Sequence, residues 1–122
     1  MPSALKLALP RARRLKTGRD FARVRRGGRL VCGTLIFNWL ALPEGTPSRL
    51  GVVTSKRLGN AVARNRGRRL MREAYRLHQF SFAAPVDLVL VARPSIAGKS
   101  FAEVERDFLT ARKRAKLQKE PA

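Results

Sequence analysis

The chain has 122 residues and a formal net charge of +19, because 27 Lys and Arg outnumber 8 Asp and Glu. This length suits one compact domain, and a hydrophobic content of 44% is enough for a small core. So large a positive charge opposes folding through self-repulsion, which a polyanionic partner would relieve. Nucleic acid is the natural partner, and an anionic membrane surface is the rival.

Cysteine content and hydropathy exclude several other classes. Cys32 is the only cysteine, so no intrachain disulfide can form, and we expect a small buried apolar side chain there. No apolar run reaches the roughly 20 residues of a membrane span. Residues 1–9 hold one Lys and short apolar stretches, which make a poor secretory signal. We therefore expect a cytoplasmic protein.

The amino-terminal part predicts an arm followed by a short helix. Residues 1–14 end in a basic stretch and are expected to form a flexible arm. Thr17 followed by Asp20 resembles a capping box in which Asp replaces the usual Glu or Gln. A helix is predicted over 18–26, and the glycine pair that follows should end it.

Two segments rich in β-formers come next. Residues 30–42 predict one long strand or two short ones, with Gly33 as a possible bend. Residues 43–47 are a loop by turn chemistry, and 50–55 predict a further strand. We expect the segments on either side of the loop to pair as an antiparallel hairpin.

The second half predicts a helix, a strand and a helix. Asn60 is a suitable N-cap for a helix over 60–78. Residues 86–92 are continuously apolar after their start, as in a strand buried on both faces. Ser100 with Glu103 forms a regular capping box for the last helix. Its apolar stripe consists of Phe101, Val104, Phe108, Ala111 and Ala115.

These elements define the expected organisation. The order α-β-β-(β)-α-β-α predicts an α+β fold, an α/β sandwich in which helices pack on a sheet of three or four strands. Residues 15–114 form a single domain, and 115–122 form a basic tail. The chain is expected to fray from Arg112 onward.

The middle helix carries the strongest functional signal. On a wheel of about 100° per residue, one arc holds apolar and small residues, flanked by Met71 and His78. That arc contains Ala63, Gly67, Leu70, Ala74 and Leu77. The other side carries arginines at four-residue spacing, namely Arg64, Arg68, Arg72 and Arg76. Like charges at this spacing cost roughly 0.2–0.5 kcal/mol per pair, which favours an anionic partner. The alternative is a solvated basic face that keeps the protein soluble.

The run from Ser55 to Glu73 resembles the signature of the bacterial ribonuclease P protein component. It contains a basic pair, then Ala-Val, Arg-Asn, a second basic pair and Arg-Glu. Leu15 to Phe21 is similar to the family's amino-terminal motif, and 87–93 to its late strand. The resemblance covers about residues 14–114.

The resemblance implies a fold and an activity. The fold would contain a left-handed βαβ crossover between parallel strands, whereas general rules favour a right-handed one. The activity is removal of the 5′ leader from precursor tRNA, with the RNA subunit as catalyst. Expected partners are ribonuclease P RNA and precursor tRNA, with no membrane and no small-molecule substrate. Mg²⁺ would be held mainly by the RNA.

The resemblance also implies site residues. The basic motif and the turn before it would contact ribonuclease P RNA, through Lys56, Arg57, Asn60, Arg64, Asn65, Arg66, Arg68, Arg69 and Arg72. Phe21 matches an aromatic residue that contacts the leader, and Arg25 stands where a second aromatic is common. Phe37 and Trp39 share a strand face and could stack on leader bases, at ~1–3 kcal/mol per base, or lie in the core.

A protein-based nuclease site is not expected. Such a site needs converging carboxylates or a His-based acid/base pair. Asp20 and Glu103 are assigned to helix caps, Glu73 to ion pairs with arginines, Asp87 to a strand start and His78 to a helix end. We therefore predict no catalytic and no metal-binding residue in the polypeptide. A non-catalytic RNA-binding protein, such as a ribosomal protein or RNA chaperone, is the main alternative, followed by a membrane-surface or DNA-binding protein.

Overall fold

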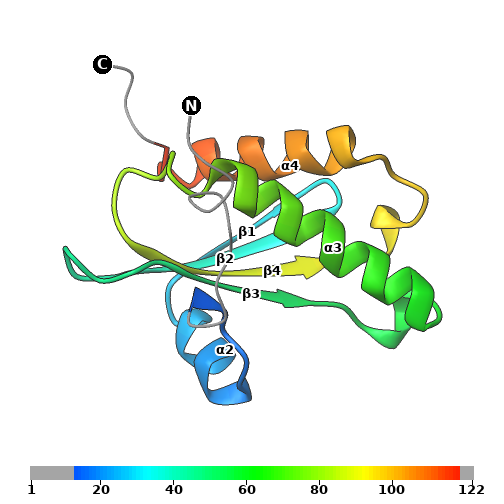
Figure 1. Ribbon diagram of the computed structural model, residues 1–122, viewed down its shortest axis with the longest axis horizontal. Coiled ribbons are helices and arrows are strands. Elements are labelled where there is room, and N and C mark those ends of the chain that lie inside the picture. Colours follow the sequence, from blue (N-terminus) through cyan, green and yellow to red (C-terminus); the bar gives the residue numbers. More distant parts are fainter. Residues whose placement is uncertain (1–12, 119–122) are drawn as a thin grey trace.

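The computed structural model describes residues 13–118, which form a four-stranded sheet with helices on both faces (Figure 1). The elements in chain order are α2 (Gly18–Val24), β1 (Gly28–Cys32), β2 (Leu35–Ala41), β3 (Arg49–Val53), the 3-10 turn η2 (Lys56–Leu58), α3 (Ala61–His78), β4 (Val86–Ala92), the 3-10 turn η3 (Pro94–Ile96) and α4 (Phe101–Arg114). This order confirms the predicted α+β sandwich. Most of the expected arm and the last four residues lie outside the described range. None of the helices within that range is long and apolar enough to cross a membrane.

The strand order is β1-β2-β4-β3, with β4 antiparallel to β2 and parallel to β3. The expected hairpin between 30–42 and 50–55 is therefore wrong. Gly33, with φ of 56°, turns the chain back between β1 and β2 instead. Because β4 is buried along nearly its whole length, it takes the central place that separates β2 from β3. The β3–α3–β4 unit is a parallel crossover, and its left-handed sense remains a prediction.

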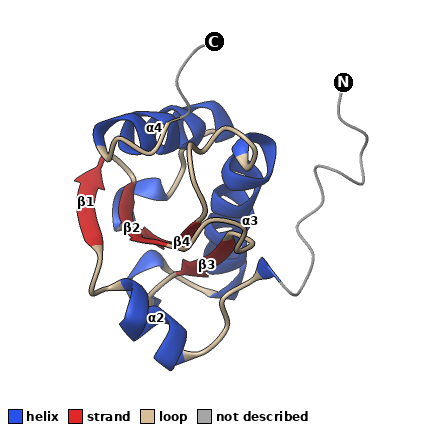
Figure 2. Cartoon of the chain, turned by 90° about the vertical axis from the view of Figure 1, so that its left-hand side faces the viewer, coloured by secondary structure: helices blue, strands red, loops and turns tan. Residues whose placement is uncertain are grey.

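The two faces of the sheet have different covers. Helices α3 and α4 lie on one face and the shorter α2 lies on the other, as the view along the sheet shows (Figure 2). The main core under α3 and α4 includes Leu88, Leu90 and Phe108, all fully buried. A smaller cluster under α2 is built on Val24 and Val89. Because strand residues alternate between faces, neighbours on β2 and β4 enter different clusters.

Helix α3 approaches its neighbours closely at Gly67. A Cβ there would lie 3.0 Å from Leu58 Cδ2 and 3.5 Å from Thr54 Cγ2. These contacts come from η2 and from the residue after β3, so a larger residue at position 67 would crowd both. The predicted core arc is wrong at its edge, since Leu77 is 39% exposed and Tyr75 only 2%. Burial raises the pKa of Tyr75 to about 12.

The two ends of α4 differ in how well they were predicted. At its start the capping box is confirmed, since Glu103 N donates to Ser100 Oγ and Ser100 N donates to Glu103 Oε2. The expectation that the chain frays from Arg112 onward is wrong for residues 112–118. Arg112 is only 8% exposed, and Ala83 N donates to the Leu117 carbonyl at 2.9 Å. Leu117 packs against the main core, so burial of apolar surface outweighs the local positive charge.

Candidate nucleic-acid interface

The basic turn η2 leads directly into the capped start of α3. Ala63 N donates to Asn60 Oδ1 at 3.0 Å, so Asn60 caps the helix as expected. The carboxamide oxygen of Asn60 therefore has a structural role within the predicted RNA-binding set. Lys56 and Arg57 lie exposed on η2 immediately before this cap. Their side chains extend the positive charge of the helix beyond its first turn.

The solvent-facing part of α3 and the turn before it are rich in cations. We define the α3 cationic surface as Lys56, Arg57, Arg64, Arg66, Arg68, Arg69 and Arg72. All seven are exposed or half-buried, and within residues 13–118 no carboxylate forms an ion pair with any of them. The acid of this helix, Glu73, pairs with Arg76, which lowers the pKa of Glu73. The charge of the surface is therefore left for an outside partner.

Two arginines of this surface are held in place by neutral groups. Arg68 Nη1 donates to Thr54 Oγ1 at 2.7 Å, and its Nη2 donates to Asn65 Oδ1 at 2.5 Å. Arg66 Nη2 donates to the Lys99 carbonyl at 2.6 Å. Such bonds fix a guanidinium without neutralising it, which lowers the entropy lost on binding an anion. The structure thus brings Asn65 and Arg68 into contact, and their common role in binding RNA stays a prediction.

Arg72 lies near two other arginines. Its pKa is lowered, chiefly by burial and further by the nearby positive charges of Arg14 and Arg68. Arg14 lies near the amino terminus in sequence, and it forms a parallel β-bridge with Leu50 of β3. The chain therefore gathers cations from two separate segments at one place. A phosphate bound there would remove this repulsion.

A second concave surface lies on the α2 side of the sheet. A cavity of about 340 Å³ is lined by Arg25, Arg29, Ile36, Asn38 and Val91. Arg25 was predicted for the leader site, and the other four were missed. Strand alternation could have identified Ile36 and Asn38, because they point away from the face that holds Phe37. We call this cavity the α2-side cavity.

Phe21 lies on the same side of the sheet without lining this cavity. Its half-buried ring covers Gly51 of β3, where an added Cβ would lie 2.4 Å from Phe21 Cε1. It packs against the small cluster of Val24 and Val89. Any side chain at residue 51 would displace the ring. The absence of a side chain at Gly51 therefore allows the Phe21 ring to pack directly on the sheet.

Phe37 and Trp39 lie on the opposite face. Phe37 is fully buried, with its ring centroid 5.8 Å from that of Phe108 on α4. Trp39 is half-buried against Gly28 of the neighbouring strand and packs on the main core. Phe37 is thus a core residue and the leader assignment is wrong for it. Phe37 and Trp39 both face α4, so the sheet separates Trp39 from Phe21.

A buried carboxylate fastens α2 to the sheet. Asp87 is fully buried and accepts from Arg23 Nη2 at 2.9 Å and from Arg49 at 3.0 Å (Nε) and 2.7 Å (Nη2). The bond to Asp87 raises the pKa of Arg49. Arg23 belongs to α2, whereas Arg49 and Asp87 belong to adjacent strands. This three-residue clamp fixes the helix that carries Phe21 and Arg25.

Three further carboxylates have structural partners. Asp20 lies 3.5 Å from Arg23, Glu105 lies 2.9 Å from His78 Nε2, and Asp107 accepts two bonds from Thr34. Among the residues from 13 to 118, no three His, Cys, Asp or Glu side chains gather where they could hold a metal ion.

A row of arginines without carboxylate partners on a helix that packs on a mixed sheet is typical of a nucleic-acid-binding protein. A family model described as Ribonuclease P matches residues 9–116. The ribonuclease P protein component of Alkaliphilus metalliredigens is 33% identical over 104 residues, covering 85% of this chain and 94% of the relative. That of Gluconacetobacter diazotrophicus is 39% identical over 100 residues, covering 80% and 86%.

Solved structures agree with these relatives. The Staphylococcus aureus RNase P protein matches with a TM-score of 0.79 and 28% identity, over 88% of this chain and 99% of that one. The Thermotoga maritima RNase P protein matches with a TM-score of 0.72 and 27% identity, over 83% and 96%. The chain belongs to the ribonuclease P protein family.

Proposed function

We propose that the protein holds ribonuclease P RNA on the α3 cationic surface and the 5′ leader of precursor tRNA on the α2 side. Membership of the family supports a role as the protein subunit of ribonuclease P in tRNA 5′ processing, within an endoribonuclease holoenzyme. The observation that carries the proposal is the α3 cationic surface itself. Arg66 and Arg68 are fixed by neutral groups, and no arginine of this surface has a carboxylate partner in the described part of the chain.

The chemistry of arginine suits a folded RNA partner. A guanidinium can bind two phosphate oxygens at once, and each phosphate contact releases counterions to the solution. The helix presents Arg64, Arg68 and Arg72 at a rise of about 6 Å per four residues, similar to the spacing of phosphates along an RNA strand. The surface therefore matches a backbone better than it matches a small anion.

The leader is assigned to the α2 side. A single strand is held best by positive charge beside exposed aromatic and apolar surface. Arg25 and Arg29 supply charge at the α2-side cavity, while Ile36 and Val91 supply its apolar wall. Phe21 offers a half-buried ring on the same side. The two RNAs would then lie on opposite faces of one sheet (Figure 2).

Hydrolysis is assigned to the RNA subunit, with Mg²⁺ held mainly by that RNA. Four of the described carboxylates clamp α2, cap α4 or pair with Arg76 or His78. The protein would assist by lowering phosphate repulsion and by positioning the substrate. Its action would be strongest where Mg²⁺ is too scarce to screen the RNA.

Reconstitution tests the proposal. Purified protein, ribonuclease P RNA and precursor tRNA are combined at low Mg²⁺, and the 5′ ends of the products are mapped. We expect cleavage at the mature 5′ end only when the RNA is present, and faster cleavage when the protein is added. Cleavage by the protein alone, or no stimulation of the RNA, would contradict the proposal.

A further inference from the structure

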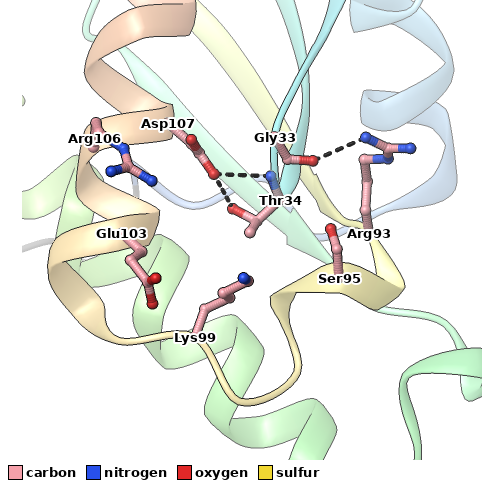
Figure 3. A pocket seen from close by; sticks show the side chains of 8 residues that line it. All are labelled: Gly33, Thr34, Arg93, Ser95, Lys99, Glu103, Arg106 and Asp107. Carbon is pink, nitrogen blue, oxygen red and sulfur yellow. Dashed lines mark hydrogen bonds between the residues drawn. The ribbon is translucent and has the colours of Figure 1, made fainter.

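A polar cavity of about 370 Å³ lies beside the start of α4, and none of its lining residues belongs to the two surfaces described above (Figure 3). The β1–β2 turn, the end of β4, η3 and the first turns of α4 meet there. Its lining includes three cationic side chains, two carboxylates and the hydroxyl of Ser95. The charged residues are Arg93, Lys99, Glu103, Arg106 and Asp107. We call it the α4-end pocket.

The two carboxylates of the α4-end pocket are engaged in holding its walls. Asp107 Oδ2 accepts from Thr34 N at 2.9 Å and from Thr34 Oγ1 at 2.8 Å, which ties the β1–β2 turn to α4. Glu103 Oε2 accepts from Ser100 N at 2.8 Å and closes the capping box. These bonds come from backbone and hydroxyl donors, so neither acid needs a cation to be satisfied.

Among the described residues the three cations have no direct ion-pair partner, although the Ser100 hydrogen bonds, helped by the charges of Lys99 and Arg106, lower the pKa of Glu103. Within residues 13–118, none of Arg93, Lys99 and Arg106 forms an ion pair with a carboxylate. Arg93 Nη1 donates to the Gly33 carbonyl at 2.9 Å, which fixes it beside the turn. Lys99 extends its ammonium group into the space between α4 and η3 (Figure 3). The positive end of the α4 dipole adds to this potential.

The α4-end pocket adjoins the α3 cationic surface through one hydrogen bond. Arg66, a member of that surface, donates to the carbonyl of Lys99 at 2.6 Å. The two helices begin at the same end of the molecule, where the parallel strands β3 and β4 also end (Figure 1). A nucleic acid lying on α3 would therefore meet the pocket at the start of that helix.

We propose that the α4-end pocket binds a phosphodiester group of the RNA held on the α3 cationic surface. Lys99 and Arg106 are the charged donors, and Arg66 positions the segment that carries Lys99. Three cations and two carboxylates leave one positive charge, which matches a singly charged phosphodiester. The inference rests on the proposed function and extends the RNA footprint from α3 around the end of the sheet.

A charge-removal pair tests the inference. Lys99→Ala with Arg106→Ala is compared with Lys113→Ala and Arg114→Ala, two exposed cations at the other end of α4. Binding of ribonuclease P RNA is measured across a salt series. Loss of one phosphate contact should weaken binding about fivefold at 0.15 M salt and reduce the salt slope by about 0.7–0.9 for the pocket pair alone. Lys99→Arg with Arg106→Lys should restore the affinity.

The outcomes separate this inference from the proposed function. If the unmodified protein neither binds nor stimulates the RNA, the proposed function itself fails. If it does both and the pocket pair binds like the control pair, the pocket inference alone is overturned. Melting temperatures measured with inorganic phosphate provide a further test. If phosphate raises the melting temperature only when Lys99 and Arg106 are present, and RNA affinity does not depend on them, the pocket serves free phosphate rather than RNA.

Discussion

The α3 cationic surface and the clamp that holds α2 use the same side chain for different purposes. On α3, Arg68 is fixed by Thr54 and Asn65 and keeps its charge for an outside partner. At the clamp, Arg23 and Arg49 both donate to the fully buried carboxylate of Asp87. One set of arginines is poised for binding, and the other supports the fold.

A buried acid decides which role an arginine takes. Asp87 is 64 residues from Arg23 and 38 residues from Arg49 in sequence, so only folding brings the three together. The arginines of α3 are neighbours on one helix, and the acid of that helix is used by Arg76. Local charge density therefore identifies the binding surface only after the pairs made by folding are known.

The largest expected effect comes from removing the acid of the clamp. Asp87→Ala leaves two guanidiniums facing an apolar site and should lower the free energy of unfolding by about 2–3 kcal/mol. Urea denaturation measures the loss, with the exposed Glu44→Ala as control. RNA affinity measured below the melting temperature should change little. Equal stability of the two variants would show that the clamp does not hold α2.

Removing the α3 arginines should weaken RNA binding and change the stability much less. Arg68→Ala with Arg72→Ala should weaken binding of ribonuclease P RNA about 30-fold at 0.15 M salt, if each arginine contacts one phosphate. The salt slope should fall by about 1.4–1.8. The free energy of unfolding should fall by much less than for Asp87→Ala, because the hydrogen bonds lost with Arg68 go to partly exposed neutral groups and Arg72 forms no ion pair within the described residues. An unchanged salt slope would place the RNA contact elsewhere on the protein.

Phe21 tests whether the α2 side recognises the leader. Phe21→Ala should weaken binding of precursor tRNA to the holoenzyme by about 1 kcal/mol, at the low end for one stacked base. Mature tRNA lacks the leader, and its binding should be unaffected. Phe37→Leu serves as a control on the other face of the sheet, since Phe37 is fully buried there. An equal loss for both tRNAs would make Phe21 purely structural.

The smallest expected effect concerns the cap of α4. The hydrogen bond from the Ser100 backbone lowers the pKa of Glu103 below its usual 4.5. The ionised form therefore stabilises the fold above that pH, and this stabilisation is lost as the pH falls through the lowered pKa. Glu103→Gln should slightly lower the melting temperature at pH 7. The difference from the unmodified protein should vanish in acid, and a difference that persists there would exclude the carboxylate as its source.

Local features were predicted well. The caps of α3 and α4 were identified at Asn60 and Ser100, because capping depends on residues three apart. The burial of β4 followed from its continuous apolar run. The cationic side of α3 followed from helical spacing, and the pair between Glu73 and Arg76 from proximity on one turn. In each case the interacting groups are neighbours in sequence.

Features that depend on distant segments were missed. Strand pairing placed β4 between β2 and β3, which no local pattern shows. Leu77 was assigned to the core and Tyr75 was not, because α3 packs on the sheet and on α4 at once. The clamp around Asp87 and the α4-end pocket each combine residues from three or more elements.

The sequence by itself determined that this chain carries a cationic helix and belongs with RNA-binding proteins. Helical periodicity and the scarcity of acids on the helix are local properties that do not depend on the arrangement of the other elements. Only the tertiary structure decided which aromatic residues are accessible and which arginines are unpaired. The reason is physical: burial and ion pairing depend on which face of the sheet each strand residue meets, and long-range packing sets that face.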